Sequence, residues 1–304
     1  MTTRGQAEPD LTIGIVNWNT RSDLEQALAS VFSAPDAVRR EVVVVDNAST
    51  DGSPEMVRRR FPAAALVVNA RNVGFARAHN QTLRAGRGRH FLLLNSDAVV
   101  HPGALEALVR FLDDHPRAAG AGPRLLNPDG SLQYSCRRFP TLLMGLFRNT
   151  PLGRLFPHNR FSRGYLMADW DHRLPREVDW LSGAAVCLRR EALAQVGLLD
   201  EGYYMYCEDM DWCYRAHRAG WQIYYVPAAV VTHVIGRSSD LRPVGMALEF
   251  HRSMARFYRK HYARRYPVGL RGLPLLGIGL RALVILLRHE LAAWQNHLRP
   301  RSRG

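Results

Sequence analysis

The chain has 304 residues, 47% of them hydrophobic, which suffices to bury the core of one large α/β domain with appendages or of two small domains. Four cysteines without a CxxC pair argue against a zinc ribbon or a disulfide scaffold, so we expect reduced thiols. The net charge of +14 is almost all arginine and suits nucleic acid, anionic lipid or a phosphorylated substrate. Because the arginines are scattered and no nucleic-acid-binding motif is present, we expect no nucleic-acid partner.

The first third of the chain alternates apolar runs with amphipathic segments. The apolar runs predict strands at 11–16, 41–45, 66–69 and 91–94. Helices are expected at 22–32, from about 53, at 75–85, and from beyond Pro102 to about 114. Such alternation predicts a mostly parallel sheet flanked by helices, which is an α/β fold.

The rest of the chain is less regular. From 123 to about 176 proline, glycine, arginine and aromatic residues dominate, and we expect long loops. Order is expected again at 178–188, in helices at 190–196 and 207–219, in strands at 222–226 and 230–233, and in a helical tail from about 248.

Polar residues follow each of the four N-terminal strands. They are Asn17 and Asn19, then Asp46, then Arg71 and Asn72, and finally Asn95, Ser96 and Asp97. In an open α/β sheet, ligands bind where strands end, although such residues also cap helices and make turns. A carboxylate such as Asp46 can accept the imide N–H of uracil or thymine. Asp97 can hold a divalent cation against a diphosphate.

Two common nucleotide-binding classes are disfavoured, because no GxGxxG follows the first strand and no P-loop motif occurs anywhere. A second acidic cluster, Glu208, Asp209 and Asp211, begins a predicted helix after an aromatic run that ends at Tyr206. Aromatic rings can pack on sugar faces while carboxylates bind hydroxyls. His233 ends a predicted strand, where a lone histidine is more often structural than a ligand.

Taken together, these stretches resemble the family 2 inverting glycosyltransferases, especially the bacterial rhamnosyltransferase-like branch. The resemblance covers about Leu11 to Ser238, and it is carried by VVVVDNASTDGS at 42–53, RNVGFARAHN at 71–80, LLLNSDAVV at 92–100, the run from WLSG to VVTH at 180–233, and GRS at 236–238. It implies a GT-A fold over 1–238. The nucleotide-binding half would occupy about 10–122, the acceptor half about 123–238, and a basic, apolar helical extension would follow at 239–304.

The resemblance also implies residue roles. It gives Asp97 and His233 to a Mg²⁺ or Mn²⁺ ion, and Asp209, with Glu208 beside it, to catalysis as the base. Donor-binding residues would be Asn17, Asn19, Asp46, Arg71, Asn72, Gly74, Asn80, Asn95 and Ser96. Acceptor-binding residues would be Trp180, Ser182, Gly183 and Tyr206. One departure is that Asn95 stands where the family's DxD motif has its first aspartate, and an amide is a poorer metal ligand.

The implied reaction is inverting transfer of a sugar from a nucleotide diphosphate to a glycan or polyprenyl-linked glycan in cell-envelope polysaccharide synthesis. The branch favours dTDP-rhamnose as donor. UDP-galactofuranose, UDP-glucose and UDP-GlcNAc remain alternatives, as does a catalytically silent nucleotide-sugar-binding module. Retention of Asp97, Glu208, Asp209 and His233 argues against the silent module.

The tail suggests a location for the enzyme. The apolar run at 269–287 is interrupted by Arg271 and Arg281, so its clean stretches are shorter than the ~20 residues that span a bilayer. Basic and aromatic residues flank it at 252–266 and 288–303. We therefore expect a helix lying on the anionic inner face of the plasma membrane of a cytoplasmic protein. Packing on the catalytic domain or a homodimer contact is the alternative. No apolar signal region precedes Asp10, so secretion is not expected.

Overall fold

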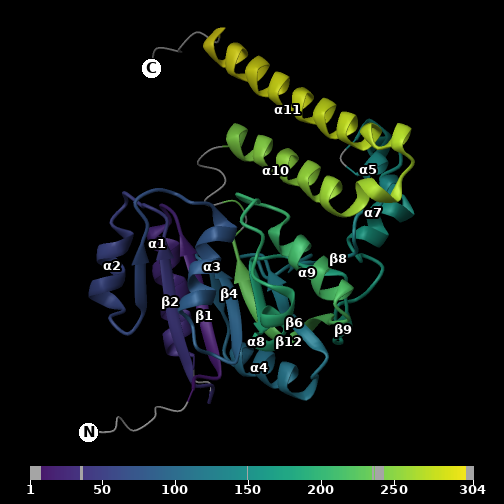
Figure 1. The fold of residues 1–304 in the computed structure, drawn as a ribbon. Coiled ribbons are helices and arrows are strands. Elements are labelled where there is room, and N and C mark those ends of the chain that lie inside the picture. Colours follow the sequence, from purple (N-terminus) through teal and green to yellow (C-terminus); the bar gives the residue numbers. More distant parts are fainter. Residues whose placement is uncertain (1–7, 35–36, 149, 235, 237–242, 299–304) are drawn as a thin grey trace, which may run out of the picture.

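A ten-stranded mixed sheet with helices on both faces forms the body of the protein (Figure 1). The computed structural model describes residues 8–34, 37–148, 150–234, 236 and 243–298. Arg237 and Ser238 of the predicted GRS stretch, and the basic residues at 299–303, lie outside the described residues. The main strand order is β3-β2-β1-β4-β11-β6-β12-β5.

The N-terminal elements agree with the sequence prediction to within about two residues. They are β1 (Leu11–Asn17), α1 (Arg21–Ser33), β2 (Arg40–Asp46), α2 (Ser53–Arg60), β3 (Ala65–Val68), α3 (Phe75–Ala85) and β4 (His90–Asn95). The strands β3, β2, β1 and β4 are parallel neighbours. Their carboxyl ends, with the polar residues that follow them, therefore meet at one edge of the sheet.

The second half adds antiparallel pairing to the sheet. Its main elements are β5 (Ala98–Val100), α4 (Ala104–Asp114), β6 (Ala118–Leu126), β11 (Ala185–Arg189), α8 (Arg190–Val196), α9 (Glu208–Arg218) and β12 (Gln222–His233). Strand β11 lies antiparallel between β4 and β6, whereas β6 and β12 are parallel. The predicted strands at 222–226 and 230–233 form one strand with a register shift between Val226 and Val230. The expected division between the two halves at 122–123 falls inside β6.

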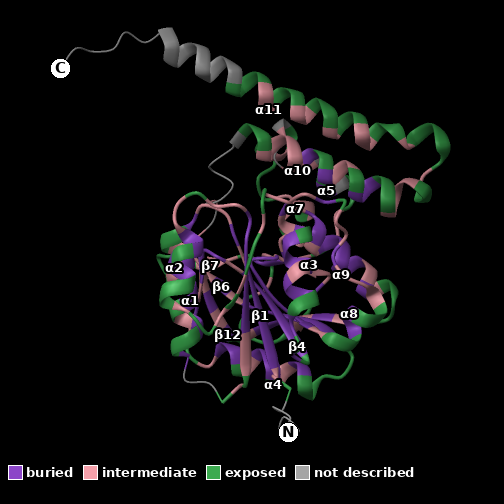
Figure 2. Cartoon of the chain, turned by 60° about the vertical axis from the view of Figure 1, so that its left-hand side comes forward, coloured by how far each residue is buried: buried purple, intermediate pink, exposed green. Residues whose placement is uncertain are grey.

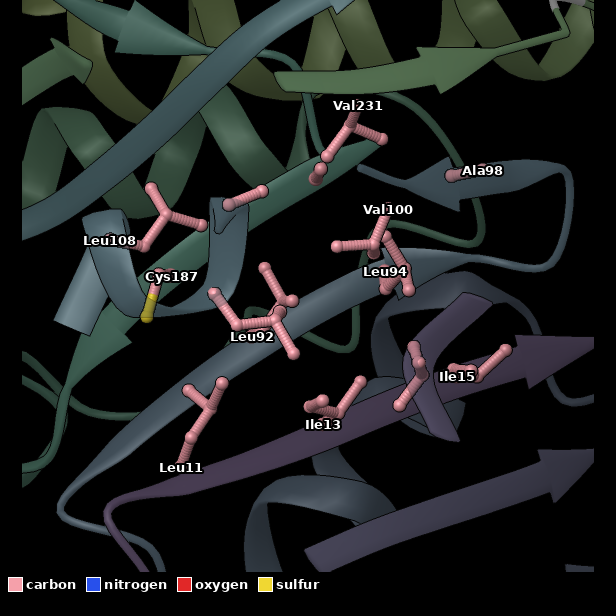
Figure 3. Close-up of a cluster of buried hydrophobic side chains, with 14 of the residues drawn as sticks. Leu11, Ile13, Ile15, Leu92, Leu94, Ala98, Val100, Leu108, Cys187 and Val231 are labelled. Atoms are coloured by element: carbon pink, nitrogen blue, oxygen red, sulfur yellow. The ribbon is translucent and has the colours of Figure 1, made fainter. Parts of the chain in front are cut away.

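The core lies between the sheet and its helices. Figure 3 shows Leu11, Ile13 and Ile15 of β1 beside Leu92 and Leu94 of β4, and all five side chains are fully buried. Fully burying such a side chain stabilises a fold by about 1.5–3 kcal/mol. The sequence signal for these central strands was therefore strong, because both faces had to be apolar.

The segment expected to be long loops instead contains short elements. They are β7 (Leu132–Gln133), β8 (Cys136–Arg137), α5 (Leu142–Phe147), α6 (Pro151–Leu155), α7 (Arg160–Tyr165), β9 (Arg176–Glu177) and β10 (Trp180–Leu181). Each of the three helices has a side-chain N-cap, supplied by Thr141, Thr150 and Asn159. Capping groups stabilise helices too short to show apolar periodicity, which is why the sequence pattern missed them.

The tail forms two long helices that lie across the edge of the sheet where the parallel strands end (Figures 1 and 2). The first is α10 (Pro243–Phe257), followed by the short turns η1 (Tyr258–Tyr262), η2 (Ala263–Arg265) and η3 (Val268–Leu270), and then by α11 (Gly272–Leu298). Because Arg281 does not break the helix, 268–289 is long and apolar enough to cross a membrane by length and composition, and none of it is buried.

Candidate active site

A cavity of about 1970 Å³ runs from the carboxyl ends of the parallel strands to α11. Most of the predicted site residues line it: Asn72, Gly74, Asn95, Ser96, Asp97, Trp180, Ser182, Gly183, Tyr206, Glu208, Asp209 and His233. The predicted metal, catalytic and acceptor residues therefore share one space. Five predicted donor residues do not line it: Asn17, Asn19, Asp46, Arg71 and Asn80.

Asn17 and Asp46 belong to a buried hydrogen-bond network at the carboxyl ends of β1 and β2. The Asn17 amide donates to Asp46 Oδ1 at 2.9 Å and to Ser49 Oγ at 3.1 Å, while the Ser49 backbone N–H donates to Asp46 Oδ2 at 2.8 Å. Asp46 is 1% exposed. This network joins the ends of β1 and β2, and the neighbours Trp18 and Asn47 reach the cavity instead. Direct base recognition by Asp46 stays a prediction.

The other three residues outside the lining lie in different surroundings. Asn19 has a left-handed backbone (φ 53) and accepts the Thr50 N–H at 2.8 Å. Asn80 is 1% exposed, and its amide bonds the backbone of Leu199 in both directions, at 2.9 and 3.0 Å. It thereby fastens α3 to the loop before α9. Arg71 is exposed on the loop before α3.

Asp97 and His233, which are distant in sequence, converge in space. Asp97 Oδ1 lies 3.3 Å from His233 Nε2, and both residues are 8% exposed. On the far side of the ring, His233 Nδ1 lies 2.7 Å from Gln133 Oε1. The Gln133 amide in turn donates to Asn127 Oδ1 at 2.9 Å and to the His233 carbonyl at 3.1 Å. Since this orients Gln133 Oε1 as an acceptor, His233 must donate from Nδ1.

That tautomer leaves the Nε2 lone pair directed at the Asp97 carboxylate, where a cation can join the two. Asn95 agrees with this tautomer, because its amide N–H lies 3.2 Å from His233 Nε2 and can only donate to it, so a cation at Nε2 would displace this contact. The buried Oδ1 of Asn95 has no hydrogen-bond partner among the described residues. Within the described residues no group of three His, Cys, Asp or Glu side chains forms a complete metal site. The donor set therefore fits a divalent ion that takes its remaining ligands from substrate oxygens and water.

Glu208 and Asp209 stand at the start of α9. Asp209 is partly exposed, and its Oδ2 accepts the Gly183 N–H at 2.8 Å. Burial raises the pKa of Asp209, although the Gly183 and Met210 N–H groups oppose this. Burial and the neighbouring Asp209 charge raise the pKa of Glu208 far more, and Glu208 Oε2 has no partner. Of the two, Glu208 therefore keeps its proton to higher pH, and Asp209 is the carboxylate that is ionised at lower pH and can accept a proton.

The backbone before these carboxylates is strained. Tyr206 (φ 69) and Cys207 (φ 65) are consecutive left-handed residues without being glycine, an arrangement that clusters at functional sites. The loop is held in place where the Phe75 N–H donates to the Tyr204 carbonyl at 2.7 Å. A Cβ on Gly74 would lie 2.6 Å from that carbonyl oxygen, so glycine is required there.

Asp211, two residues beyond the base candidate, lies in a contrasting environment. It is fully buried and surrounded by donors: Arg215 at 2.8 Å, Lys260 at 2.7 Å, His261 at 2.7 Å and the Tyr203 hydroxyl at 3.2 Å. Burial would raise the pKa of Asp211, but the hydrogen bonds outweigh it and hold the pKa well below its usual range. Asp211 thus anchors α9 to the turn after α10.

The predicted acceptor residues lie beside Asp209. The Trp180 indole N–H donates to the Arg138 carbonyl at 3.0 Å, and Arg137 lies 5.6 Å above the Trp180 ring. The Tyr206 ring meets Phe250 of α10 edge-on, at 5.5 Å between centroids. An aromatic wall therefore stands next to the candidate base, which suits a sugar face.

Sequence reasoning missed several residues of this site. Gln133 and Arg137 lie in the irregular segment, and no motif marks them. Arg148 and the α11 residues that line the cavity were also missed, because they join the site only through tertiary packing. The doubled arginine at 137–138 was the one local signal available.

The family model described as "Glycosyltransferase like family 2" matches residues 9–256. The chain is a family 2 glycosyltransferase. The family predicted from the strand-end and acidic motifs is confirmed.

The four cysteines, all buried, are unpaired thiols in the structure, in accord with the expectation of free thiols.

Curated relatives include rhamnosyltransferases. The N-acetylglucosaminyl-diphospho-decaprenol L-rhamnosyltransferase of Mycobacterium tuberculosis is 34% identical over 254 residues, covering 80% of this chain and 82% of the relative. Rhamnosyltransferase WbbL of Escherichia coli is 27% identical over 152 residues, covering 47% of this chain and 52% of the relative.

Solved structures support the fold. The mannosyltransferase PcManGT from Pyrobaculum calidifontis, in complex with GDP-Man and Mn²⁺, aligns with a TM-score of 0.57 at 20% identity, over 90% of this chain and 70% of that one. GalNAc-T7 with UDP, GalNAc and Mn²⁺ aligns with a TM-score of 0.56 at 16% identity, over 75% of this chain and 44% of that one. The GT-A glycosyltransferase fold is therefore confirmed.

Proposed function

We propose that this enzyme transfers L-rhamnose from dTDP-rhamnose, with inversion, to a glycan carried on a polyprenyl diphosphate. It would act at the cytoplasmic face of the membrane in cell-envelope polysaccharide synthesis. The observation that carries the proposal is the sharing of one cavity by the Asp97–His233 pair and Asp209, in a chain 34% identical to a rhamnosyltransferase with a diphospho-decaprenol acceptor.

The donor end of the proposal rests on Asp97 and His233. These residues would hold Mn²⁺ or Mg²⁺, which when bound neutralises the charge that develops on the departing nucleoside diphosphate. A mixed carboxylate and imidazole donor set favours Mn²⁺ over Mg²⁺. Asn95 Oδ1, which has no hydrogen-bond partner among the described residues, would accept a hydrogen bond from a ribose or sugar hydroxyl, and Asp46 would support the base-binding loop through Asn17.

The catalytic step rests on Asp209. Inverting transfer needs one positioned base to take the proton from the acceptor hydroxyl as that oxygen attacks the anomeric carbon. The Gly183 N–H donates to Asp209 Oδ2 at 2.8 Å and the Met210 N–H donates to Oδ1 at 2.7 Å, so both oxygens are held in place and each keeps a second lone pair that can take a proton. Trp180, Ser182 and Tyr206 would bind the acceptor sugar next to it.

A thermal-shift panel tests donor identity. The chain is heated with dTDP-rhamnose, UDP-galactofuranose, UDP-glucose or UDP-GlcNAc, each with Mn²⁺ and with Mg²⁺. A ligand at 100 times its Kd stabilises the native state by about 2.7 kcal/mol, so dTDP-rhamnose with Mn²⁺ is expected to raise Tm most. An Asp97→Ala variant is the matched control and should lose the part of the rise in Tm that depends on the metal. Transfer from a UDP-sugar with dTDP-rhamnose inert would overturn the rhamnosyl assignment.

A further inference from the structure

The cavity is much larger than a nucleotide sugar needs. Small-molecule sites in proteins usually occupy about 300–1,000 Å³, whereas this one measures about 1970 Å³. It continues past Asp209 between the short helices α5–α7 and the cavity face of α11. The outer lining is mostly apolar and includes Leu142, Met144, Leu152, Leu166, Leu273, Ile278 and Ile285.

Five arginines interrupt this apolar lining. Arg137 of β8, Arg148 at the end of α5 and Arg281 of α11 are partly buried, whereas Arg154 and Arg288 are exposed. Within the described part of the chain, none of the three partly buried arginines makes an ion pair with a carboxylate. Arg137 donates only to the backbone carbonyls of Tyr134 and Cys136, and Arg148 lies 4.9 Å over the ring of Tyr165.

The three charges also act on one another. Burial lowers the pKa of Arg148, and the neighbouring charges of Arg137 and Arg281 lower it further. Like charges gathered in a partly desolvated space cost free energy unless an anion joins them. The planar forks of arginine bind phosphate oxygens two at a time, and a fork stacked on Tyr165 is already oriented for this.

The cluster lies between two regions with different chemistry. On its inner side is Asp209, and the Arg137 charge opposes part of the rise that burial causes in the pKa of Asp209. On its outer side is the apolar face of α11, where Arg281 and Arg288 line the cavity one heptad apart on the same side of the helix. A molecule that lay along this path would present a hydroxyl, then an anion, then an apolar chain.

We propose that Arg137, Arg148 and Arg281 bind the diphosphate of the acceptor, while the apolar groove between α5–α7 and α11 holds the first part of its prenyl chain. This rests on the proposed function, since it assigns a position to that acceptor. It goes further in making the tail helix part of the substrate site, with Arg281 as a specificity residue for lipid-linked diphosphates over free glycans.

The test measures binding without sugar transfer. Geranylgeranyl diphosphate, below its micelle concentration, is titrated into the full chain by calorimetry in buffer with chelator, once without dTDP and once with an excess of dTDP. We expect geranylgeranyl diphosphate to bind, and geranylgeraniol, which lacks the diphosphate, to bind at least tenfold more weakly. Arg148→Gln and Arg281→Gln should each weaken it about 10–100-fold, the size of a lost charge-assisted contact. Arg110→Gln, an exposed arginine of α4 outside the cavity, is the matched control and should bind normally.

Arg281 makes the test robust, because it lies on a helix exposed along much of its length and its loss should not unfold the catalytic body (Figure 2). Equal binding of alcohol and diphosphate, or arginine variants that bind like the parent, would overturn the proposal. So would displacement of the probe by dTDP, which would put it in the donor site. Competition by phosphatidylglycerol vesicles, with the same loss in both variants, would make the cluster a membrane-headgroup site instead. Because no donor sugar is present, these results do not depend on the outcome of the donor panel.

Discussion

The two ends of the cavity differ in how their polar and charged side chains are partnered. At the inner end the polar side chains proposed to act in the reaction are held by protein neighbours: His233 by Gln133, and Asp209 by the Gly183 N–H. At the outer end Arg148 and Arg281 have no carboxylate partner among the described residues. Preorganised groups at the inner end suit a chemical step, because they need no rearrangement as charge develops. The outer end instead suits a ligand that arrives with its own negative charge.

The largest expected effect lies at the inner end. Asp209→Asn should lower kcat by about 10²–10⁴-fold, since an amide cannot take the acceptor proton. The amide oxygen of the asparagine can accept from only one of the two N–H groups that Asp209 binds, those of Gly183 and Met210. Donor-induced stabilisation should be kept, because the proposed donor site rests on Asp97 and His233. Steady-state transfer assays measure kcat, and the thermal shift measures the donor-induced stabilisation. Asp114→Asn, an exposed carboxylate at the end of α4, is the control. Turnover near that of the parent would move the base to Glu208.

The same carboxylate sets a pH dependence. The raised pKa of Asp209 means that it is protonated, and inactive as a base, at pH values where an ordinary aspartate is ionised. The rate should therefore fall as pH drops through a value above the usual ~3.9 of aspartate. Asp209→Glu should retain some activity and move this acid limb. A pH profile without an acid limb above pH ~4 would contradict the assignment.

Asp211 provides the contrast on the same helix, and its effect should be on stability. Asp211→Asn leaves Arg215, Lys260 and His261 without their shared anion, and breaking a buried pair costs about 3–5 kcal/mol. Because the native pKa is lowered, this stabilisation is present above the unfolded pKa of ~3.9 and is lost as pH falls toward the native one. Urea unfolding gives the free energy of unfolding, which should fall in Asp211→Asn and stay near that of the parent in the control Asp114→Asn. A loss below 1 kcal/mol would show that the cluster is not an anchor.

A smaller effect is expected where the metal pair meets its support. Gln133→Leu removes the acceptor for His233 Nδ1 and should weaken Mn²⁺ binding about 10–100-fold, the usual result of losing such a support. Gln133→Glu should restore it. Calorimetry with Mn²⁺ and dTDP gives the affinity. Thr232→Val is the control and should bind Mn²⁺ normally, because Thr232 lies on β12 beside His233 but its hydroxyl contacts His101. Unchanged affinity in Gln133→Leu would remove Gln133 from the metal site.

The same division separates what the sequence could predict from what it could not. The inner end follows from local signals, because parallel strand order brings Asn95 and Asp97 to the edge that holds Asp46. Asn80 and Asn17 show the limit of motif reasoning, since both are saturated by protein neighbours that only the fold brings near. At the outer end the helical tail was predicted, whereas the short helices α5–α7 gave no periodic signal. Arg148 becomes a site residue only because the fold brings α5 and α11 to line the same cavity.

The smallest expected effect concerns the outward side of α11. Leu276 and Leu283 are 59% and 51% exposed and do not line the cavity, so they separate membrane binding from acceptor binding. They lie on one face of the helix with Leu287, which is 52% exposed and is likewise absent from the cavity lining, and this suits a helix lying in an anionic membrane surface. Leu276→Asp and Leu283→Asp should each lower co-sedimentation with phosphatidylglycerol vesicles several-fold at low salt. Leu174→Asp, which changes a leucine of a loop that is 71% exposed, should not lower it. Deleting 267–304 should abolish sedimentation. If the intact chain stays in the supernatant, the stripe is a packing or homodimer surface, and a concentration-dependent change in sedimentation velocity would identify the dimer.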